Sequence, residues 1–344
     1  MSTERELIAV SQAQPPLFLG IDVGGTNIKA GLVDDGGRTL ARTSIPTEHE
    51  KGQDDAIRRL SHLVDSVIGD LGLERDSLAA IGVGTPGSMD VPAGIILDPH
   101  NLPSWRNFSI RDRLSKATGR PVAFANDATA AAYGEFWVGS GSGYRSIILL
   151  TLGTGIGGGI IVGDQSIDGE HSHGAECGHT IIDYNDTARL CGCGQPGHLE
   201  AYTCASAVVD RMTEALQSGR KSSVTGRMAG GEPLTPLMLA QEAEQGDALS
   251  LETILDTAMY LGIGIVTLMH TIDPATVILG GAMNFGGHQT QVGRRFIERV
   301  RDEVRRRAFP VLAERTVVEF ASLGGDAGYV GAAGIARAEL MAMA

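Results

Sequence analysis

The sequence predicts an α/β protein of two lobes with a central cleft. Its 344 residues are too many for one small core and suit two lobes of ordinary domain size. An apolar run, a glycine turn and a second apolar run occur at residues 17–33, and the same pattern returns at 146–162. Strand-like and helix-like patterns alternate after the first of these hairpins. A cleft between such lobes suits small-molecule chemistry.

The N-terminal lobe is expected to contain five strands and two helices. Residues 54–71 illustrate the helical signal, because their apolar residues recur with the period of one buried helix face. We place a disordered tail at 1–16 and this lobe at 17–126. The expected strands are 17–23, 27–33, 39–45, 79–84 and 121–125, and the expected helices are 54–71 and 110–118.

The C-terminal lobe, 127–344, begins with a helix at 128–137 and then repeats the hairpin. Glycine, serine, arginine and proline are frequent at 219–236, which predicts a surface loop. For the closing helix at 329–342, packing back on the N-terminal lobe is one option. The other expected elements are strands at 146–152, 160–162, 276–279 and 317–320 and long helices near 251–271 and 287–308.

Composition and charge exclude several classes of protein. Hydrophobic residues make up 42% and charged residues 20%, an ordinary globular mix apart from 47 glycines. The formal charge of -13 disfavours nucleic acid and anionic lipid as partners. Residues 301–307 are basic, but acidic residues interrupt them, so we interpret this stretch as a solvated helix face. The first sixteen residues lack the apolar core of a signal peptide, so we expect a soluble, cytoplasmic protein without a membrane-spanning segment.

The first glycine turn lies in Asp22-Val-Gly-Gly-Thr26 and is followed by Asn27. Gly24 and Gly25 lack a Cβ, so backbone N–H groups there can approach an anion beside the Thr26 hydroxyl and the Asp22 carboxylate. A plain hairpin turn explains this motif equally well. Lys29 lies two or three residues into the next strand, and we interpret it as a surface residue rather than a phosphate ligand.

The second glycine segment, residues 153–159, holds five glycines in seven residues. Such a run indicates that something approaches the backbone closely. It contains a GxGxxG match, but a strand rather than a helix is expected to follow, which disfavours a dinucleotide site and a dehydrogenase. A strand end at Gly280-Gly281 fits contact with a nucleotide base or ribose, and it fits a strand-to-helix turn equally well. The predicted nucleotide contacts here are Gly153, Thr154, Gly155, Gly157, Gly280 and Gly281.

Four motifs in this order give the chain a family resemblance: Asp22-Val-Gly-Gly-Thr26, Leu152-Gly-Thr-Gly-Ile-Gly-Gly-Gly159, Glu176-Cys-Gly-His179 and Cys191-Gly-Cys-Gly194. The chain resembles the ROK family of sugar kinases and repressors from Leu17 to about Arg337. The resemblance implies a duplicated actin-like ATPase (ribonuclease H-like) fold that binds ATP, Mg²⁺ and a sugar. The repressors carry an additional N-terminal helix-turn-helix domain, and only sixteen residues precede the first strand here, which favours the kinases.

The resemblance places the catalytic base at Asp127, between a strand and a helix. Asn126 and Asp127 also suit an ordinary helix N-cap, and the two roles are compatible. A carboxylate at a strand's carboxyl end, favoured in its ionised form by the helix dipole, can accept the proton of a sugar hydroxyl. Asp22 resembles the carboxylate of the family that binds Mg²⁺, directly or through a water molecule.

The resemblance also implies a sugar site in which carboxylates accept hydrogen bonds from adjacent hydroxyls. Loops around Gly87 and Asn101 are expected to close the pocket from the first lobe, although simple turns explain both. The predicted sugar contacts are Gly87, Asn101, Asn126, Asp127, Glu176, His179 and Glu200.

In the resembling family a histidine and three cysteines hold a structural zinc ion. Here His179, Cys191 and Cys193 stand at the first three ligand positions and His198 at the fourth. Two thiolates and two imidazoles suit tetrahedral Zn²⁺. The alternative is a site that has lost its metal. We interpret the other cysteines, Cys177 and Cys204, as small buried residues.

The sequence therefore predicts an ATP-dependent kinase for the 6-hydroxyl of a hexose, with glucose as the first choice. An N-acetylhexosamine, mannose or fructose stays open as the substrate, and so does polyphosphate as the donor. A non-catalytic sugar sensor or a transcriptional regulator is the alternative of another class. The resemblance suggests a homodimer or homotetramer.

Overall fold

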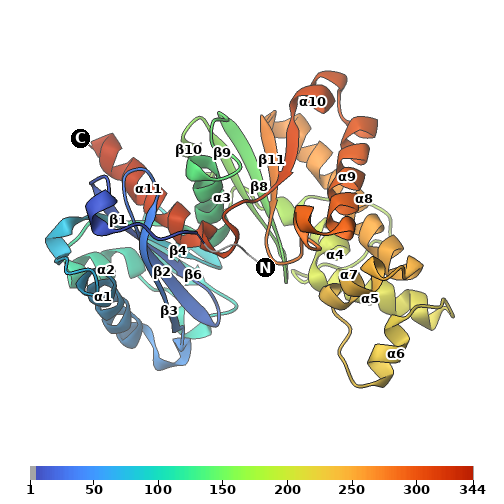
Figure 1. The fold of residues 1–344 in the computed structure, drawn as a ribbon, viewed down its shortest axis with the longest axis horizontal. Coiled ribbons are helices and arrows are strands. Elements are labelled where there is room, and N and C mark those ends of the chain that lie inside the picture. Colours follow the sequence, from blue (N-terminus) through green and yellow to red (C-terminus); the bar gives the residue numbers. More distant parts are fainter. Residues whose placement is uncertain (1–4, 344) are drawn as a thin grey trace. The chain divides into compact units, whose positions relative to one another are not determined.

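The structure, a computed structural model, describes residues 5–343 and divides them into two compact units. Unit 1 comprises residues 5–144, 159–175 and 322–343, and unit 2 comprises 145–158 and 176–321 (Figure 1). The predicted boundary at 126/127 differs from this division. A pattern read along the chain does not show that the polypeptide returns to unit 1 after unit 2 has begun.

Unit 1 contains a five-stranded sheet in the order β3-β2-β1-β4-β7. The hairpins β1–β2 and β2–β3 are antiparallel, whereas β4 and β7 continue the sheet parallel to β1. These elements confirm the predicted strands to within one or two residues. The strands are β1 (Leu17–Val23), β2 (Asn27–Val33), β3 (Thr39–Pro46), β4 (Leu78–Thr85) and β7 (Val122–Asn126), with a small ribbon of β5 (Ser88–Asp90) and β6 (Ile95–Asp98).

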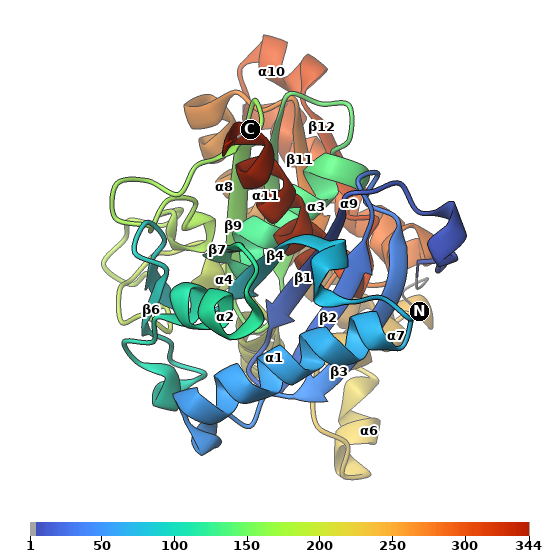
Figure 2. The same cartoon turned by 90° about the vertical axis from the view of Figure 1, so that its left-hand side faces the viewer.

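Helices cover both faces of this sheet. On one face lie α1 (Gln53–Gly69) and α2 (Ile110–Thr118) (Figure 2). Their apolar side chains are buried in a core with those of the strands. Contacts on the other face come from α3 (Asp127–Val138) and α11 (Ala327–Met343). The last helix of the chain therefore belongs to unit 1.

Two sheet glycines explain how α11 lies so close to the strands. A Cβ atom at Gly20 would lie 1.7 Å from the carbonyl oxygen of Tyr329, and one at Gly82 would lie 1.8 Å from that of Ala332. No side chain fits in such a space. Part of the glycine excess in the sequence thus serves backbone packing inside unit 1.

Residues 5–16 make ordered contacts, so the expectation of a disordered tail does not hold for them. The backbone N–H of Ile8 donates to the Thr39 carbonyl at 2.9 Å, and that of Gln14 donates to the Asp34 carboxylate at 3.0 Å. The acceptors belong to β3 and to the turn that precedes it, and composition alone cannot reveal such partners. Residues 1–4 lie outside the described part of the chain.

The second five-stranded sheet repeats the topology of the first, in the order β10-β9-β8-β11-β12. Strands β8, β11 and β12 are parallel, and β10 pairs antiparallel with β9. This duplication confirms the predicted fold class. The strands are β8 (Ser146–Leu152), β9 (Ile156–Val162), β10 (Gln165–Ser166), β11 (Thr276–Gly280) and β12 (Val317–Phe320).

Strand β9 begins earlier than the predicted strand at 160–162, because glycines 157–159 belong to the strand and not to the turn. A Cβ atom at Gly159 would lie 2.4 Å from the Ala132 Cβ and 2.8 Å from the Ala128 carbonyl oxygen, both in α3. The close approach that the glycine run indicated is therefore partly the approach of a helix. The chain passes from unit 2 to unit 1 within this strand.

The helices of unit 2 pack around the long helix α8, which contacts α4, α5, α7 and α9. Residues 219–236 were expected to form a loop, but they contain α6, so that prediction was incomplete. The helices are α4 (Glu200–Thr203), α5 (Ala205–Gln217), α6 (Val224–Ala229), α7 (Pro236–Glu244), α8 (Ala248–Ile272), α9 (Gln291–Arg307) and α10 (Pro310–Arg315).

Helix α8 is long and apolar enough to cross a membrane, although no segment of this kind was expected from the sequence. In the structure, 56% of its most apolar segment is buried within the protein, and the helix packs against other helices of unit 2. A buried core helix passes the same test of length and composition. We therefore interpret α8 as the core helix of unit 2.

The contact between α11 and the sheet predicts a large effect of one methyl group. Replacing Gly82→Ala should lower the free energy of unfolding by about 2–3 kcal/mol, because a carbonyl oxygen of α11 occupies the space of the new Cβ. Urea unfolding followed by circular dichroism measures this. Gly69→Ala is the control, because a Cβ at this position in α1 meets nothing within 4 Å. This variant should be as stable as wild type. Equal unfolding midpoints for both variants would contradict the close contact.

Candidate functional site

Two carboxylates stand at one edge of the unit 1 sheet, where parallel strands end. Asp22 is the penultimate residue of β1, and Asp127 begins α3 directly after β7. Burial and, next, the nearby Asp127 carboxylate raise the pKa of Asp22 to about 6, while Lys29 opposes this rise. The two carboxylates therefore lie close enough to interact, in the crevice position where open α/β sheets bind ligands.

Asn126 is the N-cap of α3. Its side-chain oxygen accepts hydrogen bonds from the backbone N–H groups of Ala128 at 2.9 Å and Thr129 at 3.4 Å. Asp127 Oδ1 also accepts from Ala128 at 2.8 Å. The side-chain NH₂ of Asn126 remains a donor on the opposite side of its amide group. Capping and ligand binding are thus compatible for this residue.

Lys29 is exposed, as predicted, but it lies directly across the hairpin from Asp22. The two residues are partners in the β1–β2 register, so their side chains share one face of the sheet. The Lys29 ammonium donates to the Gly325 carbonyl at 3.1 Å. A Cβ at Gly328 would lie 2.4 Å from the Asp22 carboxyl carbon, so the start of α11 packs on this carboxylate.

The first glycine turn is tight and open to solvent. The Gly24 N–H donates to the Asn27 carbonyl at 2.9 Å, and Thr47 donates from its hydroxyl to the Gly24 carbonyl at 2.7 Å. Gly25, Thr26 and Asn27 are exposed. Their backbone is therefore held in place and accessible, as a phosphate-binding turn requires.

Gly87 and Asn101 belong to two loops that pack together. Gly87 has a φ of +94°, and a Cβ there would lie 2.6 Å from the Pro99 Cα, so only glycine fits. Asn101 is exposed, and its Cβ lies 3.5 Å from the Cβ position of Gly25. The structure thus brings Asn101 next to the first glycine turn, and Gly87 supports the loop that carries it.

In unit 2 the second glycine turn borders a cavity of about 410 Å³ with a mostly apolar lining. Gly153 and Thr154 form part of its wall, together with residues from α7 and from the segment after β11. This volume lies in the range of small-ligand pockets and suits an apolar ring such as a nucleobase. The described lining also includes Ala205, Thr235, Pro236, Leu237, Ala240, Gln241, Glu244, Ala282, Met283, Phe285, Gly286 and Thr290.

Gly280 and Gly281, at the end of β11, stand next to the lining of this pocket rather than in it. Among the described residues, the lining on this side begins at Ala282, one residue after Gly281. Gly281 has a φ of +87°, and a Cβ there would lie 2.3 Å from the Leu152 carbonyl oxygen. The pair therefore lets the chain cross β8 closely, and the backbone of Met283 then donates to Leu152 at 3.0 Å.

The residues of α7 that line this pocket were not predicted from the sequence. Thr235 caps α7 by accepting from the Met238 N–H at 3.1 Å, and Pro236 is the first helical residue. That Thr-Pro pair signals a helix start. No local signal reveals that Leu237, with 67% of its surface exposed, lines a cavity built partly by residues 282–290.

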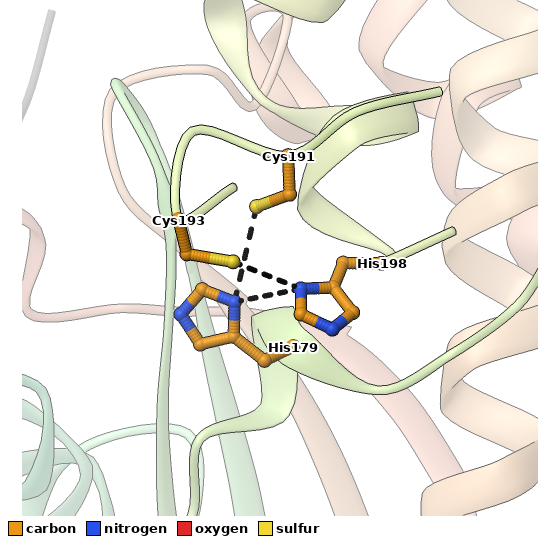
Figure 3. A group of neighbouring side chains, drawn as sticks. All are labelled: His179, Cys191, Cys193 and His198. Carbon is orange, nitrogen blue, oxygen red and sulfur yellow. Dashed lines mark hydrogen bonds between the residues drawn. The ribbon is translucent and has the colours of Figure 1, made fainter. Parts of the chain in front are cut away.

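The four predicted metal ligands converge (Figure 3). The ligand atoms of His179, Cys191, Cys193 and His198 all lie within 4.8 Å of one another. His198 Nδ1 lies 3.2 Å from His179 Nδ1 and 3.3 Å from Cys193 Sγ, and Cys191 Sγ lies 3.9 Å from His179 Nδ1. Two ligands bonded to one tetrahedral zinc ion at about 2.0–2.3 Å would stand roughly 3.3–3.8 Å apart.

The surroundings of this cluster shift the pKa values of two of its four residues. Burial and, next, the His179 ring lower the pKa of His198, which favours the neutral imidazole that ligates metals. Burial is the largest cause that raises the pKa of Cys191 to about 12, so its thiol keeps the proton until a cation favours the thiolate. The other two cysteines, Cys177 and Cys204, are buried, as predicted.

His179 faces two groups. Its Nδ1 lies 3.2 Å from His198 Nδ1 in the cluster of predicted metal ligands, and its Nε2 lies 3.8 Å from the Glu176 carboxylate. Glu200 also contacts this cluster, because its Oε1 accepts from the Cys191 thiol at 3.3 Å. Of the unit 2 residues predicted to bind sugar, His179 is therefore itself a predicted metal ligand, and Glu176 and Glu200 each contact one.

The fold and these sites define a two-unit protein of the actin-like ATPase fold with a candidate nucleotide pocket. Strand β9 follows the GxGxxG match, so a dinucleotide-binding strand-turn-helix is absent at this turn. A family model described as "ROK family" matches residues 18–339. The chain belongs to the ROK family.

Similar proteins extend over nearly the whole chain. A glucokinase of Thermotoga maritima is 32% identical over 93% of this chain and 97% of that protein. A ROK hexokinase structure from Thermus thermophilus is 33% identical, covers 95% of this chain and 99% of that one, and superposes with a TM-score of 0.79. A ROK family glucokinase from Streptomyces griseus, solved with glucose and AMPPNP, is 29% identical over 94% of this chain and 99% of that one, with a TM-score of 0.71.

The buried carboxylate of Asp22 predicts a pH dependence of stability. Its pKa of about 6 lies above the ordinary value of 3.8, so the folded protein binds the extra proton between these values. The contribution of Asp22 to stability, measured as the difference between wild type and Asp22→Asn, should therefore fall as the pH rises from about 4 to 6, by about 2–3 kcal/mol at most. Asp22→Asn should remove this dependence and be the more stable protein at pH 8.

Urea unfolding at several pH values measures the effect on wild type and Asp22→Asn. Asp70→Asn, which changes an exposed carboxylate at the end of α1, is the control and should keep the wild-type dependence. A wild-type stability that rises through this pH window relative to Asp22→Asn would show that the carboxylate is not destabilised by its surroundings.

Proposed function

We propose that this chain is an ATP-dependent hexose kinase that phosphorylates the 6-hydroxyl of its substrate, with glucose as the first candidate. The observation that carries the proposal is the cavity of about 410 Å³ bordered by Gly153 and Thr154, because it joins a nucleobase-sized apolar space to a glycine turn. Membership of the ROK family and the similarity to glucokinases over nearly the whole chain support it.

In unit 1, Asp127 is proposed to accept the proton of the sugar hydroxyl as the phosphoryl group arrives. The N-terminal end of α3 favours its ionised form. Phosphoryl transfer is a loose process, so positioning and charge neutralisation provide most of the rate. Asp22, next to the open turn at Gly25 and Thr26, is the residue we assign to Mg²⁺, which neutralises phosphate charge when bound.

The predicted sugar contacts remain part of this proposal. Gly87, Asn101 and Asn126 belong to unit 1, and Glu176, His179 and Glu200 belong to unit 2. Carboxylates and amides recognise hydroxyl patterns, because a missing partner leaves a buried polar group unpaired. N-acetylhexosamines, mannose and fructose differ from glucose by single groups, so they are the competing substrates. A non-catalytic sensor or regulator is the competing class, and the presence of both carboxylates and both glycine turns favours the enzyme.

We also propose a structural Zn²⁺ ion held by two cysteines and two histidines. The interatomic distances in the cluster and the lowered pKa of His198 support it. Reduced cysteines suit a cytoplasmic protein. The strong negative charge argues against nucleic acid or membrane as partners, and a homodimer or homotetramer is the assembly we propose.

The kinase proposal predicts the effect of removing the base. Wild type should release ADP from MgATP in the presence of glucose, and Asp127→Asn should lower kcat by about 10²–10⁴-fold with little change in the KM for MgATP. A coupled assay with a panel of hexoses and N-acetylhexosamines measures this. Asp70→Asn should be fully active. Turnover on another sugar would change the substrate assignment, and no turnover on any sugar would favour the sensor.

The metal proposal predicts the composition of the purified protein. Elemental analysis should find about one zinc per chain in wild type and less in His198→Ala, whereas His198→Cys should retain it because a thiolate can replace the imidazole. Chelation should lower the melting temperature and raise the KM for sugar, since His179 faces both sites. His62→Ala, an exposed histidine on α1, should keep its zinc. Zinc-free wild type with unchanged stability would contradict the site.

A further inference from the structure

Glu200 makes a contact that sugar binding does not explain. It is the first residue of α4, and its Oε2 accepts a hydrogen bond from the backbone N–H of Ile156 at 2.8 Å. Ile156 is the first residue of β9 and directly follows the second glycine turn. A carboxylate oxygen thus holds the end of the turn that borders the candidate nucleotide cavity.

The fit between Glu200 and the turn is close. A Cβ at Gly155 would lie 2.6 Å from Glu200 Oε2. The backbone of Gly155 lies outside the left-handed region, so its φ does not require glycine. A side chain at this position therefore requires the Glu200 carboxylate to move away from the turn.

The segment that carries Glu200 also holds the beginning of the turn. The backbone N–H of Ala205, at the start of α5, donates to the Gly153 carbonyl at 2.9 Å. Within the turn, the Gly153 N–H donates to the Gly155 carbonyl at 3.0 Å. Residues 200–205 thus fix both ends of the turn, while Gly153 and Thr154 face the cavity.

We propose that Glu200 is a positioning residue of the nucleotide site, whose carboxylate holds Gly155 and Ile156 so that Gly153 and Thr154 present their backbone to the nucleotide. The inference rests on the proposed function, because it takes the turn to be a nucleotide site. It adds a role to the sugar contact assigned to Glu200, and this second role operates without sugar.

Three explanations of Glu200 differ in what they predict. A residue that only binds sugar leaves nucleotide affinity unchanged in sugar-free protein. A residue that only stabilises the fold changes the unfolding midpoint and leaves the affinity of the folded protein unchanged. A positioning residue changes nucleotide affinity without sugar, and the change depends on Gly155.

The test is calorimetric titration of sugar-free protein with MgADP. Glu200→Ala should weaken binding about tenfold, as expected when one charge-assisted hydrogen bond is lost. Glu200→Gln should stay within about threefold of wild type, because its amide oxygen can still accept from Ile156. Gly155→Ala should weaken binding to a similar extent as Glu200→Ala, because its methyl group displaces the carboxylate.

The double variant Gly155→Ala/Glu200→Ala gives the decisive comparison. With the carboxylate gone, the new methyl group meets nothing of Glu200, so the double variant should bind no more weakly than Glu200→Ala alone. Additive losses would overturn the proposal, and so would wild-type affinity in Glu200→Ala.

Two controls test whether zinc loss or the removal of any glutamate explains a change in MgADP affinity. Glu200 Oε1 contacts Cys191, so the zinc content of each variant is measured, and Gly155→Ala tests the turn without removing that contact. Glu314→Ala, an exposed glutamate of α10, should bind MgADP like wild type. Wild type that fails to bind MgADP overturns the proposed function together with this inference, whereas binding that is insensitive to Glu200→Ala overturns the inference alone.

Discussion

The contact of α11 with β1 and β4, made without intervening side chains, is the constraint on which unit 1 depends. Gly20 and Gly82 leave room for the backbone of the helix and nothing else. The same contact brings Gly328 against Asp22 at the end of β1. Burial by this helix contributes to the raised pKa of that carboxylate. A packing requirement and the electrostatics of the candidate site thus have one source.

Local patterns were sufficient to predict most of the elements and the fold class. Both hairpins, the helix near 54–71 and the alternation of the first lobe follow from periods of two and 3.6 residues, which short windows contain. The predicted and observed elements differ where contacts with distant segments determine the local structure. Glycines 157–159 are strand residues because α3 packs on them, and residues 5–16 are ordered because β3 and the preceding turn provide partners.

The candidate site was predictable where one segment contains it. The four predicted metal ligands lie within residues 179–198, so a motif could indicate them, and the structure brings them together. The candidate nucleotide cavity combines α7, the second glycine turn and residues 282–290, and no short window contains such a set. Lys29 was interpreted correctly as exposed, but its place opposite Asp22 depends on the register of β1 and β2.

The place of α11 in the chain has a consequence for biosynthesis. Unit 1 receives its last helix from residues 327–343, which the ribosome makes after the whole of unit 2. Until then α11 cannot cover the glycine-lined face of β1 and β4, and the apolar surface that this helix buries stays open to water in the nascent polypeptide. Unit 2 has all its residues earlier than unit 1 has. The unit that comes first in the sequence is therefore the last whose residues have all been synthesised.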